Sequence, residues 1–143
     1  MRIPVSLPHA RRGIALAAFA AAALAGCSEL ADERPPTWSY LHAAIIKPSC
    51  TTANCHSSLS ARAGIDLGDR RDAYLALVGS TCDGPALPGE PPRNFVDPGA
   101  PETSTLLYML RAQDAVRMPP DVALPESEVG LVEQWILEGA PCD

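Results

Sequence analysis

Two cysteines and a histidine stand close together in this sequence: Cys50, then four residues, then Cys55 and His56 side by side. Thiols in such a motif can add to the two vinyl groups of a haem, and an imidazole directly after the second thiol can reach the iron from the same side. The two thiols could instead form a short-range disulfide, with the histidine a bystander. A third alternative is a zinc site completed by Cys82, although its ligand spacing is irregular. Of these chemistries, haem attachment accounts best for the position of the histidine.

The motif follows a stretch that is typical of an amphipathic helix. Apolar residues recur in it at helical spacing, at Trp38, Leu41 and Ile45. A helix is therefore expected over 38–47, with Thr37 as its N-cap and Pro48 ending it.

Three further helices are predicted after the motif. They cover 70–78, between Asp69 as cap and Gly79; 104–111; and 126–138, with Pro125 at the first turn and Gly139 after the end. The last helix has an apolar face made of Val129, Leu131, Val132, Trp135 and Ile136. Residues 79–102 contain six prolines and four glycines, which predicts a long loop. With no strand pattern, the sequence predicts an all-α fold of about four short helices with long Pro-rich loops.

Four short helices leave a thin hydrophobic core for a small domain. Disulfides, a metal or a cofactor are the usual supplements. Four cysteines besides Cys27 permit three disulfide connectivities. Cys82 and Cys142 lie outside the motif and are expected to pair, the alternative being two free thiols. Their bridge would pin the Pro-rich loop to the C-terminus and contribute about 4 kcal/mol in the chain-entropy model.

The N-terminus has the three parts of a bacterial export signal. Arg2, Arg11 and Arg12 precede an apolar run over 14–24, and Leu24-Ala25-Gly26-Cys27 follows it. The run is shorter than the roughly 20 apolar residues of a membrane span. The segment Leu24-Ala25-Gly26-Cys27 resembles the lipobox of bacterial lipoproteins, in which cleavage precedes the cysteine and the cysteine is acylated. Residues 1–26 are therefore expected to be a lipoprotein signal peptide, and Cys27 the lipidated residue.

Cleavage before Cys27 would change the charge of the chain. It would leave 117 of the 143 residues and remove three of the 11 basic residues but none of the 17 acidic ones, for a formal charge of −9. This balance argues against nucleic-acid partners, since phosphate binding needs clustered Lys and Arg. Residues 27–36 would tether the acylated end in a lipid bilayer to a domain over 37–143. By the lipoprotein resemblance, Ser28 implies sorting to the outer membrane of the cell envelope, facing the periplasm or the surface.

From Trp38 to Ala140 the chain resembles class I c-type cytochromes, in particular small cytochrome-like lipoprotein domains of bacteria. The resemblance rests on a short helix before Cys50, the C-x4-C-H motif, the segment Arg117-Met118-Pro119-Pro120 at the distance of a Met-Pro distal loop, and a final helix that ends in Glu138-Gly139-Ala140. The commoner motif has two residues between the cysteines, and four form a rarer variant. The resemblance implies a small cytochrome c-like fold around one covalently attached haem c.

The resemblance also implies roles for individual residues. Cys50 and Cys55 would carry the thioether links, His56 would be the proximal iron ligand and Met118 the distal one. A thioether opposite an imidazole favours ferrous iron and raises the reduction potential. His42, expected on the surface of the first helix, is the competing distal ligand. Met109 lies in an apolar helical run and is expected in the core.

The function implied is that of a monohaem lipoprotein relaying single electrons between redox partner proteins in the periplasm or at the membrane. Trp38 and Trp135 are expected to pack the first helix against the last, as in one wall of the haem pocket of this family. The chain is not expected to be an enzyme, because nothing indicates a dedicated catalytic base, although a displaceable methionine can allow peroxidase-like chemistry. The alternative is a haem-free, disulfide-stapled lipoprotein that acts as a surface or assembly module.

Overall fold

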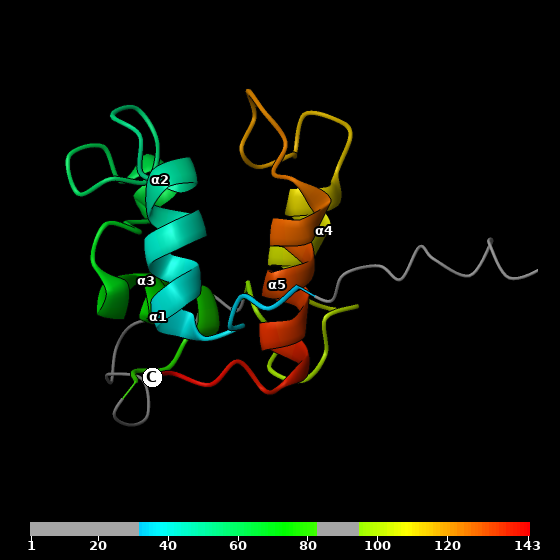
Figure 1. The fold of residues 1–143 in the computed structure, drawn as a ribbon. Coiled ribbons are helices and arrows are strands. Elements are labelled where there is room, and N and C mark those ends of the chain that lie inside the picture. The colour runs from blue at the N-terminus through cyan, green and yellow to red at the C-terminus, as the bar shows by residue number, and fades with distance from the viewer. Residues whose placement is uncertain (1–31, 83–94) are drawn as a thin grey trace, which may run out of the picture. The chain divides into compact units, whose positions relative to one another are not determined.

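The structure, a computed structural model, describes residues 32–82 and 95–143 (Figure 1). The predicted signal peptide over 1–26, the lipidation of Cys27 and residues 27–31 of the predicted tether lie outside the described residues. Residues 33–143 form one unit, and all that follows concerns this unit.

A single continuous helix runs from Trp38 into the motif (Figure 1). It consists of α1 (Trp38–Leu41), the π-helical turn η1 (His42–Ile46) and α2 (Lys47–Cys50). Thr37 caps its start, as predicted, by accepting a hydrogen bond from the Tyr40 N–H.

The prediction that Pro48 ends this helix is wrong. The N–H of Lys47 donates to the carbonyl of His42, five residues back, so the turn before Pro48 is wider than an α turn. Proline has no N–H and normally crowds the carbonyl four residues before it, and a widened turn relieves that conflict. The helix therefore continues to Cys50, where the N–H of Thr51 donates to the carbonyl of Lys47.

The other predicted helices are present with small differences at their ends. They are α3 (Arg70–Val78), α4 (Thr105–Arg111) and α5 (Glu126–Leu137), and a short 3-10 turn that was not predicted, η2 (Arg62–Gly64), precedes α3. The carboxylate of Asp69 caps α3, and these hydrogen bonds from the N–H groups of Arg71 and Asp72 lower its pKa. Gly79 closes α3 with a φ of 78°. No strand occurs in residues 32–82 or 95–143, which confirms the all-α prediction for that part.

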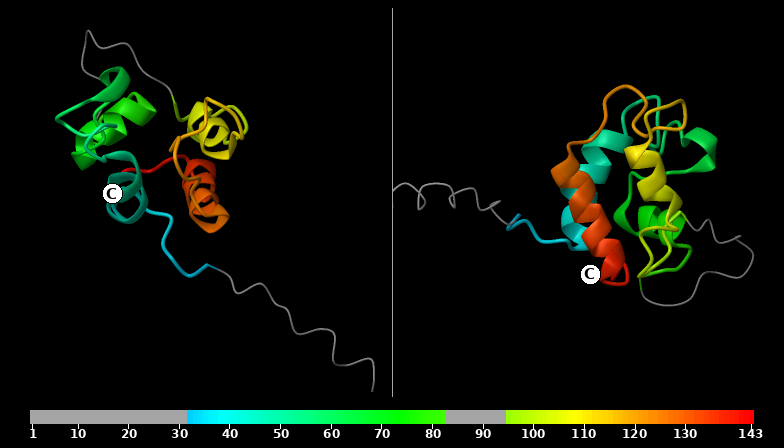
Figure 2. Two further views of the ribbon diagram at one scale, coloured as in Figure 1. Left: turned by 90° about the horizontal axis from the view of Figure 1, so that it is seen from above. Right: turned by 90° about the vertical axis from the view of Figure 1, so that its right-hand side faces the viewer.

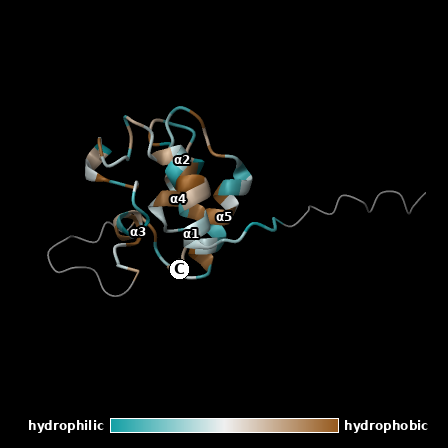
Figure 3. Ribbon diagram, turned by 60° about the vertical axis from the view of Figure 1, so that its left-hand side comes forward, coloured by the Kyte–Doolittle hydropathy of each residue, from teal (hydrophilic) through white to brown (hydrophobic). Residues whose placement is uncertain are grey.

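Seen from above, the first helix, α3, α4 and α5 stand around a common centre (Figure 2). The predicted apolar face of α5 is buried, and it contacts α4, whose buried residues are Leu106, Leu107 and Leu110. Both helices carry hydrophobic segments in Figure 3. Met109 is only partly buried and is not one of the buried core residues, so the prediction that it belongs to the core is only partly met.

Three aromatic rings connect the first helix, α3 and α5. Trp38 stacks on Trp135, which confirms the predicted packing of the first helix against the last, and Tyr74 meets both indoles edge-on. Each ring donates its one polar hydrogen to a backbone carbonyl. Trp38 donates to Arg70, Trp135 donates to Pro141, and Tyr74 donates to Ala140. The trio is therefore both close-packed and free of unsatisfied polar atoms.

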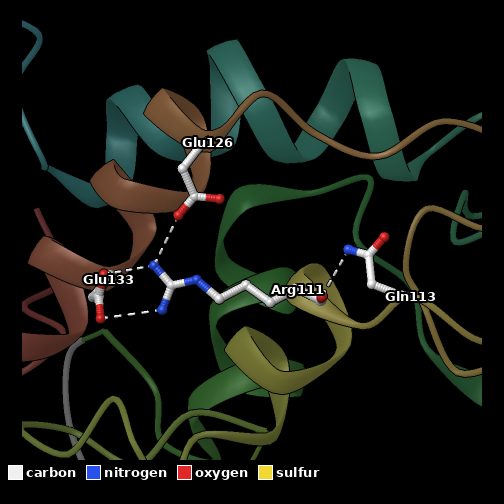
Figure 4. A network of polar contacts seen from close by, with 4 residues as sticks. All are labelled: Arg111, Gln113, Glu126 and Glu133. Atoms are coloured by element: carbon white, nitrogen blue, oxygen red, sulfur yellow. Dashed lines mark hydrogen bonds and ion pairs between the residues drawn. The ribbon is translucent and has the colours of Figure 1, made fainter.

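An ion-pair network joins the end of α4 to α5 (Figure 4). The guanidinium of Arg111 donates to both carboxylate oxygens of Glu133, at 2.7 and 3.2 Å, and to Glu126 at 3.1 Å. The hydrogen bonds from Arg111 lower the pKa of Glu133. The network thus fixes the point where the chain leaves α4 for the loop that carries Met118.

The C-terminal tail is fastened to the rest of the domain. Cys82 and Cys142 form a disulfide, the pairing expected from the sequence, with their Cα atoms 5.2 Å apart. The carboxylate of Asp143 accepts hydrogen bonds from the N–H and the hydroxyl of Ser39. Arg70 donates to the terminal carbonyl oxygen of Asp143. Among the described residues, every helix is too short or too polar to be a membrane span.

Candidate functional site

The two motif cysteines lie at either end of a closed loop. Cys50 is the last residue of α2, and its carbonyl accepts a hydrogen bond of 3.0 Å from the N–H of His56. Within the loop, the N–H of Cys55 donates to the carbonyl of Thr52 at 2.9 Å. The four intervening residues therefore fold outward as a turn, and the backbone of His56 lies beside that of Cys50.

The chain that follows holds Cys55 and His56 from the other side. The carbonyl of Cys55 accepts hydrogen bonds from the N–H of Arg62, at 3.1 Å, and from the hydroxyl of Ser60. The carbonyl of His56 accepts from the N–H of Leu67 at 2.7 Å. With these contacts the motif is anchored on both sides and does not depend on one flexible loop.

The imidazole of His56 has a defined orientation. Its Nδ1 lies 3.2 Å from the carbonyl oxygen of Ile65. Because a carbonyl can only accept, this contact assigns the proton to Nδ1 and leaves the lone pair on Nε2. Proteins fix the tautomer and ring direction of a metal-binding histidine by a hydrogen bond of this kind, made by the ring nitrogen that does not bind the metal.

Both motif thiols are free and partly buried. The hydroxyl of Thr52 donates to the sulfur of Cys55 at 3.1 Å. Burial, together with the nearby Cys55 thiol, raises the pKa of Cys50 to about 11, so this thiol remains protonated at neutral pH. The two sulfurs are thus placed in one loop without being joined to each other.

The zinc alternative is not assembled in this structure. Cys82, which would complete that ligand set, is bonded to Cys142. Among the residues that the structure describes, no three His, Cys, Asp or Glu side chains gather as a metal site would require.

Met118 lies on a separate loop, between α4 and α5. The N–H of Met118 donates to the carbonyl of Met109 at 3.0 Å, and the N–H of Arg117 donates to the carbonyl of Asp114 at 3.1 Å. The side chain of Met118 is partly buried. This loop and the loop of the motif stand at the same end of the domain in Figure 1 and in the right-hand view of Figure 2.

The expectation that His42 lies on the surface of the first helix is wrong. Only 5% of His42 is exposed, and its ring lies 5.7 Å from that of Trp38, one helical turn earlier on the same buried face. Its Nε2 lies 3.0 Å from the carbonyl oxygen of Leu67. The residue that competes with Met118 as a distal ligand is therefore a hydrogen-bonded part of the core.

Two groups at the site were assigned no role of their own from the sequence. The carbonyl of Ile65 is a backbone atom, and no side-chain pattern marks it. The other is the guanidinium of Arg117, whose Nε is buried without a hydrogen-bond partner. The feature of the sequence that could have identified Arg117 is its position directly before Met118.

No family model matches the chain, and comparisons with curated proteins and with solved structures give no match either. Two free thiols and an imidazole with a directed Nε2 in one anchored loop are the groups that covalent haem attachment needs.

Proposed function

We propose that residues 37–143 are a monohaem c-type cytochrome domain that relays single electrons. The observation that carries the proposal is the hydrogen bond between Nδ1 of His56 and the carbonyl of Ile65, in a loop that also presents the free thiols of Cys50 and Cys55. A zinc site would use the thiols as thiolates, and a disulfide would give the directed imidazole no role. The haem assignment uses all three groups.

In this proposal each residue has one task. The thiols of Cys50 and Cys55 would hold the haem through thioether bonds, each formed by addition of an S–H across one vinyl group, so that no oxidant would be consumed. Nε2 of His56 and the sulfur of Met118 would be the iron ligands. When bound, the haem would supply a one-electron ferric–ferrous couple. With two protein ligands on the iron, electron transfer would be favoured over substrate turnover.

The proposed location is the bacterial cell envelope. Cleavage before Cys27 and acylation of that residue would anchor the chain at the outer membrane, and redox proteins in the periplasm or membrane would be its partners. The disulfide between Cys82 and Cys142 supports this placement, because structural disulfides persist in oxidising compartments such as the periplasm.

The test is expression of the full chain together with a c-type maturation system. After denaturation, a haem stain and the intact mass should both report one haem on the polypeptide. The matched control is Cys50→Ser/Cys55→Ser, which should lose the covalent haem and keep the disulfide between Cys82 and Cys142. A colourless wild-type protein of apo-polypeptide mass, with Cys50 and Cys55 recovered as a disulfide in a non-reducing peptide map, would instead establish the haem-free alternative.

A further inference from the structure

Arg117 has a buried nitrogen that the described structure leaves without a partner. Its Nε is shielded from solvent and makes no hydrogen bond. The guanidinium is permanently charged, and a buried charged donor without an acceptor is more destabilising than an unsatisfied neutral donor. Such an atom indicates that a partner is missing from the site.

The surrounding contacts hold this nitrogen in place. Nη2 of Arg117 donates to the carbonyl of Pro120 at 2.8 Å, so the side chain folds back over its own loop. The backbone is fixed on either side, by the bond from Arg117 to Asp114 and by the bond from Met118 to Met109. Turning Nε toward water would break the contact with Pro120, and the fork geometry of the guanidinium leaves Nε–H as a fixed donor.

A carboxylate is the group that best satisfies a buried guanidinium N–H, because charge-assisted bonds are shorter and stronger than neutral ones. The ion pairs described in this domain engage Arg111 and not Arg117. Met118 directly follows Arg117 in the chain, so a haem held by Met118 would lie near Arg117. The carboxylates that a haem carries are its two propionates.

We infer that Nε of Arg117 donates a hydrogen bond to a haem propionate. This inference rests on the proposed function and adds to it a positioning residue with an electrostatic role. A cation beside the propionate keeps that carboxyl ionised and favours the ferrous state of the iron. Without Arg117, the pKa of the propionate would be higher, and the midpoint potential would then depend on pH.

The test compares the haem-loaded wild type with Arg117→Gln, Arg117→Lys and the control Arg71→Gln, which alters an exposed arginine on α3. Midpoint potentials are measured between pH 5 and pH 8. Arg117→Gln should lower the midpoint at pH 8 and give it a pH dependence that wild type and Arg71→Gln lack, while Arg117→Lys should recover part of the pH 8 value. Loaded Arg117→Gln with wild-type midpoints at every pH would overturn the inference and leave the cytochrome assignment intact.

A second measurement needs no variant at Arg117. In the nitrogen-15-labelled holoprotein, the Nε–H of Arg117 should exchange with solvent much more slowly than that of Arg71, because it is buried and bonded to an anion. Equal exchange rates would overturn the inference even if both variants failed to mature. A wild-type chain that takes up no haem would contradict the proposed function itself, and the inference with it.

Discussion

The indole of Trp38 stacks on the indole of Trp135 with ring centroids 5.2 Å apart and planes 26° apart. One residue begins the helix that leads into the motif and the other lies in the last helix, 97 positions later. Since both side chains are only 1% exposed, this contact joins the two ends of the domain in its core. The loop with Cys55 and His56 is built on the helix that this contact holds.

Truncation of this contact should be strongly destabilising. We expect Trp135→Ala to lower the free energy of unfolding by about 3–5 kcal/mol, because a large buried aromatic side chain leaves a cavity. Urea denaturation followed by circular dichroism measures the change. Leu137→Ala on the same helix is the control, since that side chain is 58% exposed and its loss should have an effect within about 0.5 kcal/mol. Equal effects of the two substitutions would contradict the central role of the stack.

Met118→Ala should change the iron site without removing the haem. Because the thioether raises the reduction potential, the haem-loaded variant should have a lower midpoint, a changed spin state, or both. The absorption spectrum and a redox titration measure these effects. Met109→Ala is the control. The backbone carbonyl of Met109 accepts the hydrogen bond from the Met118 N–H, so the substitution keeps that bond, and its side chain is only partly buried. A spectrum unchanged by Met118→Ala would show that Met118 is not the distal ligand.

The Arg111 network should stabilise the domain in a pH-dependent manner. Arg111 lowers the pKa of Glu133 in the folded state, so the stabilisation is present above the unfolded pKa of that carboxyl and is lost as the pH falls through the folded one. Glu133→Gln should therefore reduce stability at pH 7 by about 0.2–1 kcal/mol, as for other partly exposed pairs, and by less at pH 3.

Urea titrations of Glu133→Gln at both pH values and at low and high salt measure this effect. High salt should shrink the difference between variant and wild type, because the two side chains are 34% and 40% exposed and ions screen their attraction. Glu102→Gln, at an exposed position before α4, is the control. A loss of stability that is the same at pH 3 and pH 7 would show that the hydrogen-bonded charge of Glu133 is not its source.

Removal of the disulfide should lower stability without affecting haem attachment. The bridge joins residues 60 positions apart, for which the chain-entropy model gives about 4 kcal/mol. Cys82→Ser/Cys142→Ser should show that loss in thermal or urea unfolding and retain the covalent haem, since neither residue belongs to the motif. Loss of haem from this variant, under conditions where it is folded, would show that the tail helps to build the site.

The helices after the motif could be predicted because local signals agree with the packing. In α3 and α5 the caps, the glycines and the apolar spacing all indicate the same boundaries to within a few residues. The end of the first helix could not be predicted in this way. Pro48 is a correct local signal to stop, and the wide turn before it is a tertiary adjustment that no residue type announces.

The site was predictable only where side chains carry the chemistry. Cys50, Cys55 and His56 could be identified by type and spacing, and the disulfide between Cys82 and Cys142 by elimination. The acceptor for His56 is a carbonyl, which every residue possesses, so its identity required the fold. The burial of His42 could not be predicted, because a polar residue in a helix is ordinarily expected on the solvent side.

The π-helical turn at 42–46 also sets the rotational phase of Cys50 about the helix axis. Successive residues of an α-helix advance by about 100°, so a helix that accommodates one extra residue in a turn displaces everything after it by a comparable angle. Trp38 keeps its direction into the core, while the direction of Cys50 is set by the turn between them. Closing that turn to a regular α turn with all its residues kept would therefore rotate Cys50 by about 100°, whereas deletion of Ala44, an exposed residue within the turn, would remove the extra residue and leave Cys50 facing the Cys55 loop.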